Sequence, residues 1–127
     1  AHLHYWSVQL TRPAAREEVL DAFSASSRIA LIRMDAGLTA LNTVKELMAD
    51  LGRPNDNLYE VALWSDMLKV EGDELFYAYM VDNQAIVIPE TIDAIRALTG
   101  TVSAKESIAK TDATLGIGLL TETLGNR

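Results

Sequence analysis

Hydrophobic and polar positions alternate at the start of the chain. Residues 3–10 follow a period of two, which predicts a β-strand. The face of this strand that we expect to point toward the core carries His4, Trp6, Val8 and Leu10. Pro13 suits the first turn of a helix, predicted over residues 13–23. Residues 29–34 are short and mostly apolar, as is typical of a buried strand.

A period of 3.6 residues follows position 39 and predicts a second helix. Thr39 is expected to cap it, and Gly52 fits the position after its last turn. The apolar stripe of this helix consists of Leu41, Val44, Leu47, Met48 and Leu51. Residues 53–57 are rich in Pro, Asn and Asp, which predicts a turn.

The middle of the chain contains strand patterns only. Three strands are predicted, over residues 58–64, 67–70 and 75–81, with residues 71–74 as a hairpin turn between the last two. The third run is apolar on both faces, which favours a central position in the sheet. Residues 85–88 predict a further short extended piece.

Two helices are predicted toward the C-terminus. Pro89 opens the first and Gly100 closes it. Ser103 and Glu106 have the spacing of a capping box at the start of the second. We expect residues 118–127 to form a flexible tail.

The predicted order of elements is β-α-β-α-β-β-β-α-α. It indicates an α+β fold with a mixed or largely antiparallel sheet and helices packed on one face. A length of 127 residues fits one domain.

Composition narrows the classes of function. The formal net charge of −7 argues against nucleic acid and against an anionic membrane as partners. No window approaches 18 consecutive apolar residues, and no signal-peptide pattern begins the chain. The sequence contains no cysteine, which excludes disulfides, thiolate metal sites and a cysteine nucleophile within it. These features predict a cytoplasmic protein.

The two histidines of the chain, His2 and His4, lie two positions apart and therefore on one face of the first strand. With the amine of Ala1 they could bind a transition metal, although no third side-chain ligand is indicated. One of them could equally act as a general base near neutral pH. Two solvated imidazoles at a frayed end of the chain are the simplest interpretation.

Gly116, Ile117 and Gly118 form half of a dinucleotide-binding fingerprint. Thr121 stands where the third glycine belongs, and the segment follows a predicted helix, whereas the fingerprint follows a strand. We therefore predict no cofactor site in this segment.

Several stretches, in order along the chain, resemble archaeal-type (type II) phosphorylating glyceraldehyde-3-phosphate dehydrogenase. The matching stretches are Ala1-His2-Leu3-His4, residues 16–23, Gly37-Leu38-Thr39, residues 51–64, residues 87–98 and residues 106–111. The similarity to residues 51–64 is the closest. Together the matches cover residues 1–117 and are similar to the C-terminal portion of that family's catalytic domain.

The resemblance implies the chemistry of an NAD- or NADP-dependent oxidoreductase of glycolysis. In the family, a cysteine attacks glyceraldehyde 3-phosphate, hydride passes to the nicotinamide, and phosphate releases 1,3-bisphosphoglycerate. A histidine activates the cysteine and accepts the hydroxyl proton, and by motif position it corresponds to His2. The resemblance also implies homo-oligomers that form through the sheet.

The family's cysteine and its Rossmann domain lie outside the matched region. We therefore expect this chain alone to be inactive, to bind no cofactor, and to need the missing Rossmann half as a partner. Residues 81–85 and 89–91 depart from the family pattern, so cofactor contacts there are not carried over. The alternative is a stand-alone oligomerisation or interaction module that uses the fold without catalysis.

Overall fold

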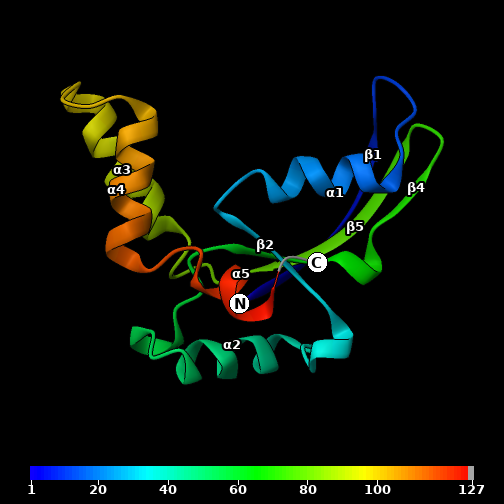
Figure 1. Ribbon diagram of the computed structural model, residues 1–127, viewed down its shortest axis with the longest axis horizontal. Helices are drawn as coiled ribbons and strands as arrows, with labels where there is room; N and C mark the ends of the chain where they lie inside the picture. Colours follow the sequence, from blue (N-terminus) through cyan, green and yellow to red (C-terminus); the bar gives the residue numbers. More distant parts are fainter. Residues whose placement is uncertain (126–127) are drawn as a thin grey trace.

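The computed structural model describes residues 1–125, and a five-stranded mixed sheet forms its centre (Figure 1). The strands are β1 (His2–Gln9), β2 (Ile29–Ile32), β3 (Val61–Trp64), β4 (Lys69–Glu71) and β5 (Glu74–Val81). Their order is β1-β5-β3-β2, and β4 pairs with β5 as well. The position of β5 among three neighbours confirms the prediction that its run, apolar on both faces, is central.

Whether two strands pair parallel or antiparallel depends on the segment that connects them. β5 is antiparallel to β1, β3 and β4, and the β4–β5 pair is the predicted hairpin. β2 and β3 are parallel, because a helix crosses between them. β1 and β2 lie at the two edges of the sheet, so β1 has a strand partner on one side only.

Within residues 1–125, five α-helices accompany the sheet. They are α1 (Arg16–Ser24), α2 (Leu41–Asp50), α3 (Val87–Thr99), α4 (Ala104–Leu115) and α5 (Leu119–Leu124). Single 3-10 turns occur at Met34–Ala36, Pro54–Asp56 and Ser65–Met67. The α+β class, the mixed sheet and the predicted order of elements through α4 are confirmed.

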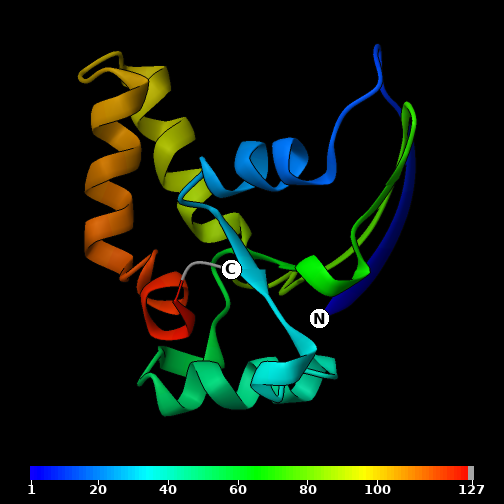
Figure 2. The ribbon, with the colours of Figure 1, turned by 45° about the vertical axis from the view of Figure 1, so that its right-hand side comes forward.

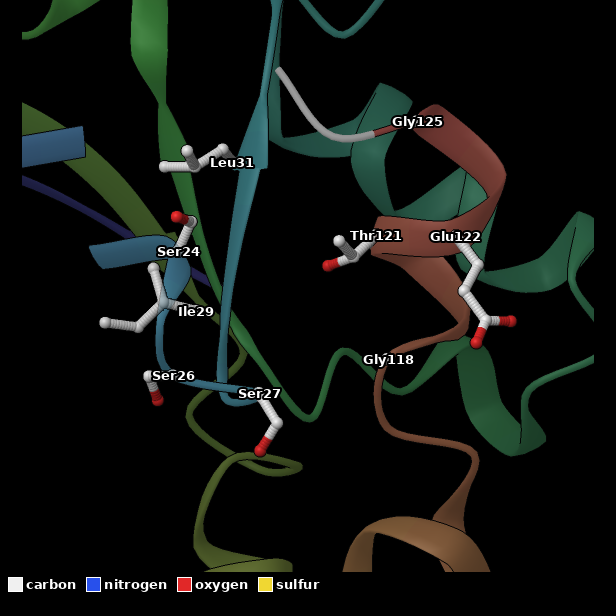
Figure 3. Close-up of a pocket in the computed structure, with 9 residues that line it drawn as sticks. All are labelled: Ser24, Ser26, Ser27, Ile29, Leu31, Gly118, Thr121, Glu122 and Gly125. Atoms are coloured by element: carbon white, nitrogen blue, oxygen red, sulfur yellow. The ribbon is translucent and has the colours of Figure 1, made fainter. Parts of the chain in front are cut away.

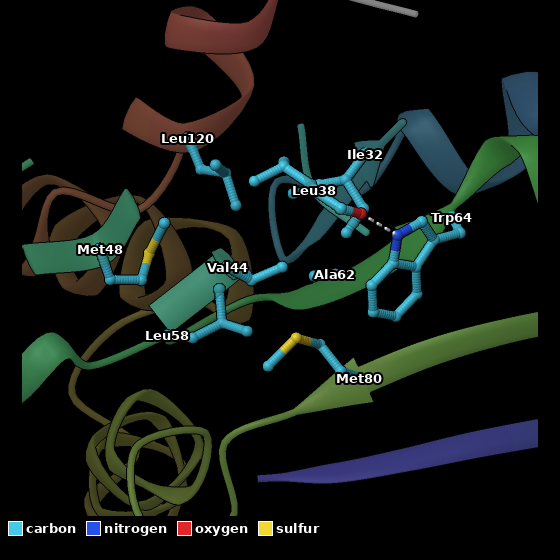
Figure 4. Packing of buried hydrophobic residues seen from close by; sticks show 10 residues of the cluster. Ile32, Leu38, Val44, Met48, Leu58, Ala62, Trp64, Met80 and Leu120 are labelled. Carbon is cyan, nitrogen blue, oxygen red and sulfur yellow. Dashed lines mark hydrogen bonds between the residues drawn. The ribbon is translucent and has the colours of Figure 1, made fainter. Parts of the chain in front are cut away.

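The prediction that all helices pack on one face of the sheet is wrong. Ile32 and Trp64 belong to a core under α2 and α5 (Figure 4). Leu31 and Leu63 belong to a second core under α1. Figure 1 accordingly shows α1 and α2 on opposite sides of the sheet. The reason is that β2 and β3 are apolar at every position, so both of their faces need cover.

Helices α3 and α4 lie side by side as a hairpin, away from the β1 end of the sheet (Figure 2). Gly100 ends α3 in the left-handed conformation, with φ at 63°. The capping box at the start of α4 is confirmed, since Ser103 Oγ accepts from the Glu106 amide at 3.3 Å and Glu106 Oε2 accepts from the Ser103 amide at 3.0 Å.

Residues 85–88 are not extended, which corrects the prediction for that segment. The backbone carbonyl of Asp82 accepts from the amides of Ala85 and Ile86, and its carboxylate accepts from the Gln84 amide at 3.2 Å. This turn starts the helical path early, and α3 begins at Val87, two residues before Pro89.

The flexible tail expected over residues 118–127 differs from what the described residues show. Residues Leu119–Leu124 form α5, and Leu120 is completely buried in the core shared with α2. The apolar side chain of Leu120 gives this short helix a place to pack, which polar tail residues would lack. Residues 126–127 lie outside the described part of the chain.

Candidate functional site

The histidine strand, β1, carries the candidate general base at its N-terminal end. His2 pairs with Val81 and His4 pairs with Tyr79 in the antiparallel register with β5. The two imidazoles share one face, as the sequence predicts, with ring centroids 6.2 Å apart. His2 is exposed and His4 is half-buried, so His2 is the imidazole open to a substrate.

An aromatic row runs from helix α1 to the end of β1. The ring centroids of Phe23 and Tyr77 are 5.4 Å apart, and those of Tyr77 and Tyr79 are 6.0 Å apart. Tyr79 stacks on His4 with ring centroids 5.0 Å apart and an angle of 6° between the ring planes. His2 completes the row beyond His4. The row is not predictable from the sequence, because its members come from three separate elements.

A hydrogen bond to Tyr79 and the burial of Tyr77 complete the description of the row. The Trp6 indole N–H donates to the Tyr79 hydroxyl at 3.1 Å. Burial raises the pKa of Tyr77, and the neighbouring Tyr79 raises it further. Tyr77 is therefore a neutral phenol at physiological pH.

A metal centre at this strand would need more ligands than the two imidazoles. Within residues 1–125, no group of three or more His, Cys, Asp or Glu side chains is placed to hold a metal ion. The metal hypothesis for Ala1, His2 and His4 thus receives no additional side-chain ligand from the fold.

The segment that departs from the family pattern lies next to the histidine strand. Val81 is opposite His2, and Asp82 follows it with its side chain 7% exposed and paired to Lys45 of α2. Burial acts to raise the pKa of Asp82, but hydrogen bonds from Lys45 and from the Gln84 amide outweigh it, and the pKa lies below its ordinary value. Asp82 is therefore an ionised, structural carboxylate.

A buried ion pair, Arg53–Glu60, was not found by sequence reasoning. Two hydrogen bonds of 2.6 Å join the guanidinium to the carboxylate, with side chains 4% and 0% exposed. Arg53 also donates to the Gly116 carbonyl at 2.9 Å, and the Gly118 amide donates to Glu60 at 3.3 Å. The sequence feature that could have indicated this pair is a single acidic residue, Glu60, directly before the apolar residues of β3.

The contacts of Gly116 and Gly118 decide what this glycine segment does. Their backbone groups serve the Arg53–Glu60 pair, and both residues have positive φ, 67° and 103°, in a turn between two helices. A dinucleotide fingerprint needs free amides between a strand and a helix. The segment does not fit a phosphate cradle, in agreement with the sequence analysis.

A pocket of about 230 Å³ lies between the serine-rich loop after α1 and helix α5 (Figure 3). Its lining residues are Ser24, Ser26, Ser27, Ile29, Leu31, Gly118, Thr121, Glu122 and Gly125. It contains no histidine, and Ser27 donates its hydroxyl hydrogen to Asp112 at 2.5 Å. Among these lining residues, Glu122 carries the one ionisable side chain.

None of the helices in residues 1–125 combines the length and the hydropathy of a membrane span.

No protein-family model matches the chain. The chain is similar to glyceraldehyde-3-phosphate dehydrogenases of archaea, with 37% identity to that of Metallosphaera sedula, 40% to that of Pyrococcus furiosus and 42% to that of Pyrobaculum calidifontis.

These similarities cover 90–92% of this chain but only 33–35% of each relative. The chain therefore spans about a third of the length of the curated relatives it matches. Over that span the resemblance predicted from the sequence is confirmed: the chain matches a C-terminal part of the archaeal glyceraldehyde-3-phosphate dehydrogenases.

Proposed function

We propose that this chain provides the C-terminal part of the catalytic domain of a glyceraldehyde-3-phosphate dehydrogenase. The proposed reaction converts glyceraldehyde 3-phosphate, inorganic phosphate and NAD or NADP into 1,3-bisphosphoglycerate. The observation that carries the proposal is the similarity of 37–42% over nine tenths of the chain. The exposed imidazole of His2 on an ordered strand supplies a group able to do part of this chemistry.

His2 is the general base of the proposal. An imidazole titrates close to neutral pH, so it can accept a proton from a thiol or from a hydroxyl during the reaction. His2 is exposed, so its ring can be reached from solvent. His4 stacks on the Tyr79 ring and lies next to His2 on the same strand face.

Neither the nucleophile nor the cofactor site is assigned to this chain. The sequence contains no cysteine, and the Gly116–Gly118 turn does not fit a dinucleotide. We therefore expect the nucleophile and NAD or NADP to be held by a Rossmann-containing partner segment. In isolation the chain should show no dehydrogenase activity and no micromolar binding of NAD or NADP by calorimetry.

A hybrid enzyme tests the proposal. The matched third of the Pyrobaculum calidifontis enzyme is replaced by this chain, and NAD(P)H formation is followed with glyceraldehyde 3-phosphate and phosphate. An active hybrid is expected. His2→Gln should then lower kcat by about 100- to 10,000-fold, the usual contribution of a general base.

The matched control is His4→Gln, which removes the other imidazole from the same strand face. We expect a smaller loss than for His2→Gln. Equal activity of His2→Gln and the parent hybrid would contradict the role of His2. A hybrid that folds and oligomerises but has no activity would favour the stand-alone interaction module.

We also propose that the chain self-associates through its sheet. Leu3 and Tyr5, on one face of β1, are 40% and 69% exposed, and Trp6, on the other face, is 48% exposed, so this edge strand presents large apolar side chains on both faces. Sedimentation should show a dimer or larger species for this chain. Tyr5→Ser combined with Leu3→Ser should shift it toward the monomer, whereas a monomeric parent would overturn the proposal.

A further inference from the structure

The aromatic row defined above, Phe23-Tyr77-Tyr79-His4-His2, connects the core to the candidate base. Phe23 belongs to α1 and packs in the core beneath it together with Tyr77 and Tyr79. Each successive ring in the row lies within 5.0–6.2 Å of the next, centroid to centroid. Tyr79 is the member at which the row passes from the central strand β5 to the edge strand β1.

Tyr79 is itself fixed from two directions. On its own strand it contacts Tyr77, and across the sheet it accepts the indole hydrogen of Trp6. Trp6 and His4 are two residues apart on β1 and so share a face of the sheet, where His4 lies directly opposite Tyr79 and Trp6 lies opposite Tyr77. One phenol thus contacts β1 through both a stacked ring and a hydrogen bond.

The end of β1 needs such an anchor. β1 is an edge strand, and its first residues pair with β5 on one side only. A strand paired on one side leaves a row of backbone groups without a strand partner, so side-chain contacts add to what holds it in place. A general base, in contrast, acts only when its reacting nitrogen stays within hydrogen-bond reach of the proton it accepts.

We propose that Tyr79 is a positioning residue for the histidine strand. It holds His4 by ring stacking and holds Trp6 by its hydroxyl, and it thereby keeps the imidazole of His2 in a constant direction at the strand end. The inference rests on the proposed function of His2, although the anchoring itself is measurable without any reaction.

Nuclear magnetic resonance on the 127-residue chain tests the anchor directly. The chain has two histidines, so their ring protons give two separable sets of signals. In the parent protein, the His4 ring protons should be shifted upfield by the stacked Tyr79 ring. Tyr79→Leu should abolish that shift and accelerate amide exchange at residues 2–6.

Tyr79→Phe separates the two contacts. The stacked ring remains, so the His4 signal should keep its upfield position, whereas the Trp6 indole N–H should lose its acceptor and move. Tyr5→Phe is the matched control, because it removes one hydroxyl from an exposed tyrosine of β1 and should change neither signal. Unchanged His4 signals in Tyr79→Leu, or an unmoved Trp6 indole signal in Tyr79→Phe, would overturn the anchor.

Kinetics in the hybrid enzyme test positioning apart from folding. Tyr79→Leu should lower kcat by about 10- to 100-fold with an unchanged KM, as expected for a misplaced catalytic group. Tyr79→Phe should recover most of that loss. If His2→Gln has no effect while the resonance shifts behave as expected, the proposed role of His2 is wrong and the anchor stands. Equal kcat in Tyr79→Leu and the parent would show that Tyr79 does not position the base.

Discussion

The buried ion pair of Arg53 and Glu60 connects two turns that are distant in the sequence. The pair joins the turn before β3 to the turn between α4 and α5, which are more than 50 residues apart in sequence. Their charges are removed from water, and the two short hydrogen bonds compensate for that loss. The Arg53 guanidinium also lies over the Tyr59 ring at 5.2 Å, and its Nε has no hydrogen-bond partner in the described structure.

Glu60→Gln should therefore destabilise the protein strongly. The substitution keeps the side-chain size but leaves the Arg53 charge buried without a counter-charge, and a loss of about 3–5 kcal/mol in the free energy of unfolding is expected. Urea denaturation followed by circular dichroism measures it. Glu18→Gln breaks the exposed pair with Arg12 and should leave the urea midpoint unchanged. Similar midpoints for both variants would contradict the structural role of the buried pair.

At the scale of elements, α5 is a short helix whose stability depends on packing. Six residues are too few for a helix to persist in water without tertiary contacts. Leu120 provides such a contact, since it is fully buried with Ile32 and Met48 in the core beneath α2. The Arg53–Glu60 pair fixes the turn from which the helix starts.

Leu120→Ala should lower the free energy of unfolding by about 2–5 kcal/mol, because it opens a cavity in a packed core. Leu119→Ala is the control in the same helix, since Leu119 is 37% exposed, and its effect should stay below about 1 kcal/mol. Equal effects in a urea titration would mean that α5 does not pack as described.

At the scale of the whole molecule, an ionic network around Arg28 attaches the α3–α4 hairpin to the sheet. Arg28 precedes β2 and donates to Glu90 at 2.8 Å, to Asp93 at 2.7 Å and to Asp112 at 2.7 Å. Asp93 also accepts from Ser107 and Thr111 of α4. Burial acts to raise the pKa of Asp93, but hydrogen bonds from Ser107, Arg28 and Thr111 outweigh it, and the pKa lies below its ordinary value of 3.8.

Stability should consequently fall in acid. A carboxyl with a lower pKa in the folded chain stabilises the fold above about pH 4, and this stabilisation is lost as the pH drops through the folded-state pKa. Urea unfolding between pH 7 and pH 3 should show the decline, and Asp93→Asn should flatten it. Asp50→Asn makes the same change in net charge at an exposed position of α2. Equal flattening by both variants would assign the effect to overall charge rather than to the network.

Local structure was predictable from the sequence, and so was the shared face of the two histidines. Apolar periodicity, Gly100 and the Ser103–Glu106 capping box predicted elements that the fold confirms, because turns and caps depend on residues a few positions apart. The shared face of His2 and His4 followed in the same way from the period of a strand.

Only the tertiary structure decided how distant segments meet. The two-sided cover of the sheet, the packing of α5, the Arg53–Glu60 pair and the contact of Tyr79 with Trp6 and His4 all join separate elements. Arg53 and Glu60 are 7 positions apart, Tyr79 and His4 are 75 apart, and Leu120 and Ile32 are 88 apart. A single residue such as Tyr79 has the same local pattern whether it faces solvent or a histidine. What it touches depends on strand order and register, and those are set by packing of the whole chain.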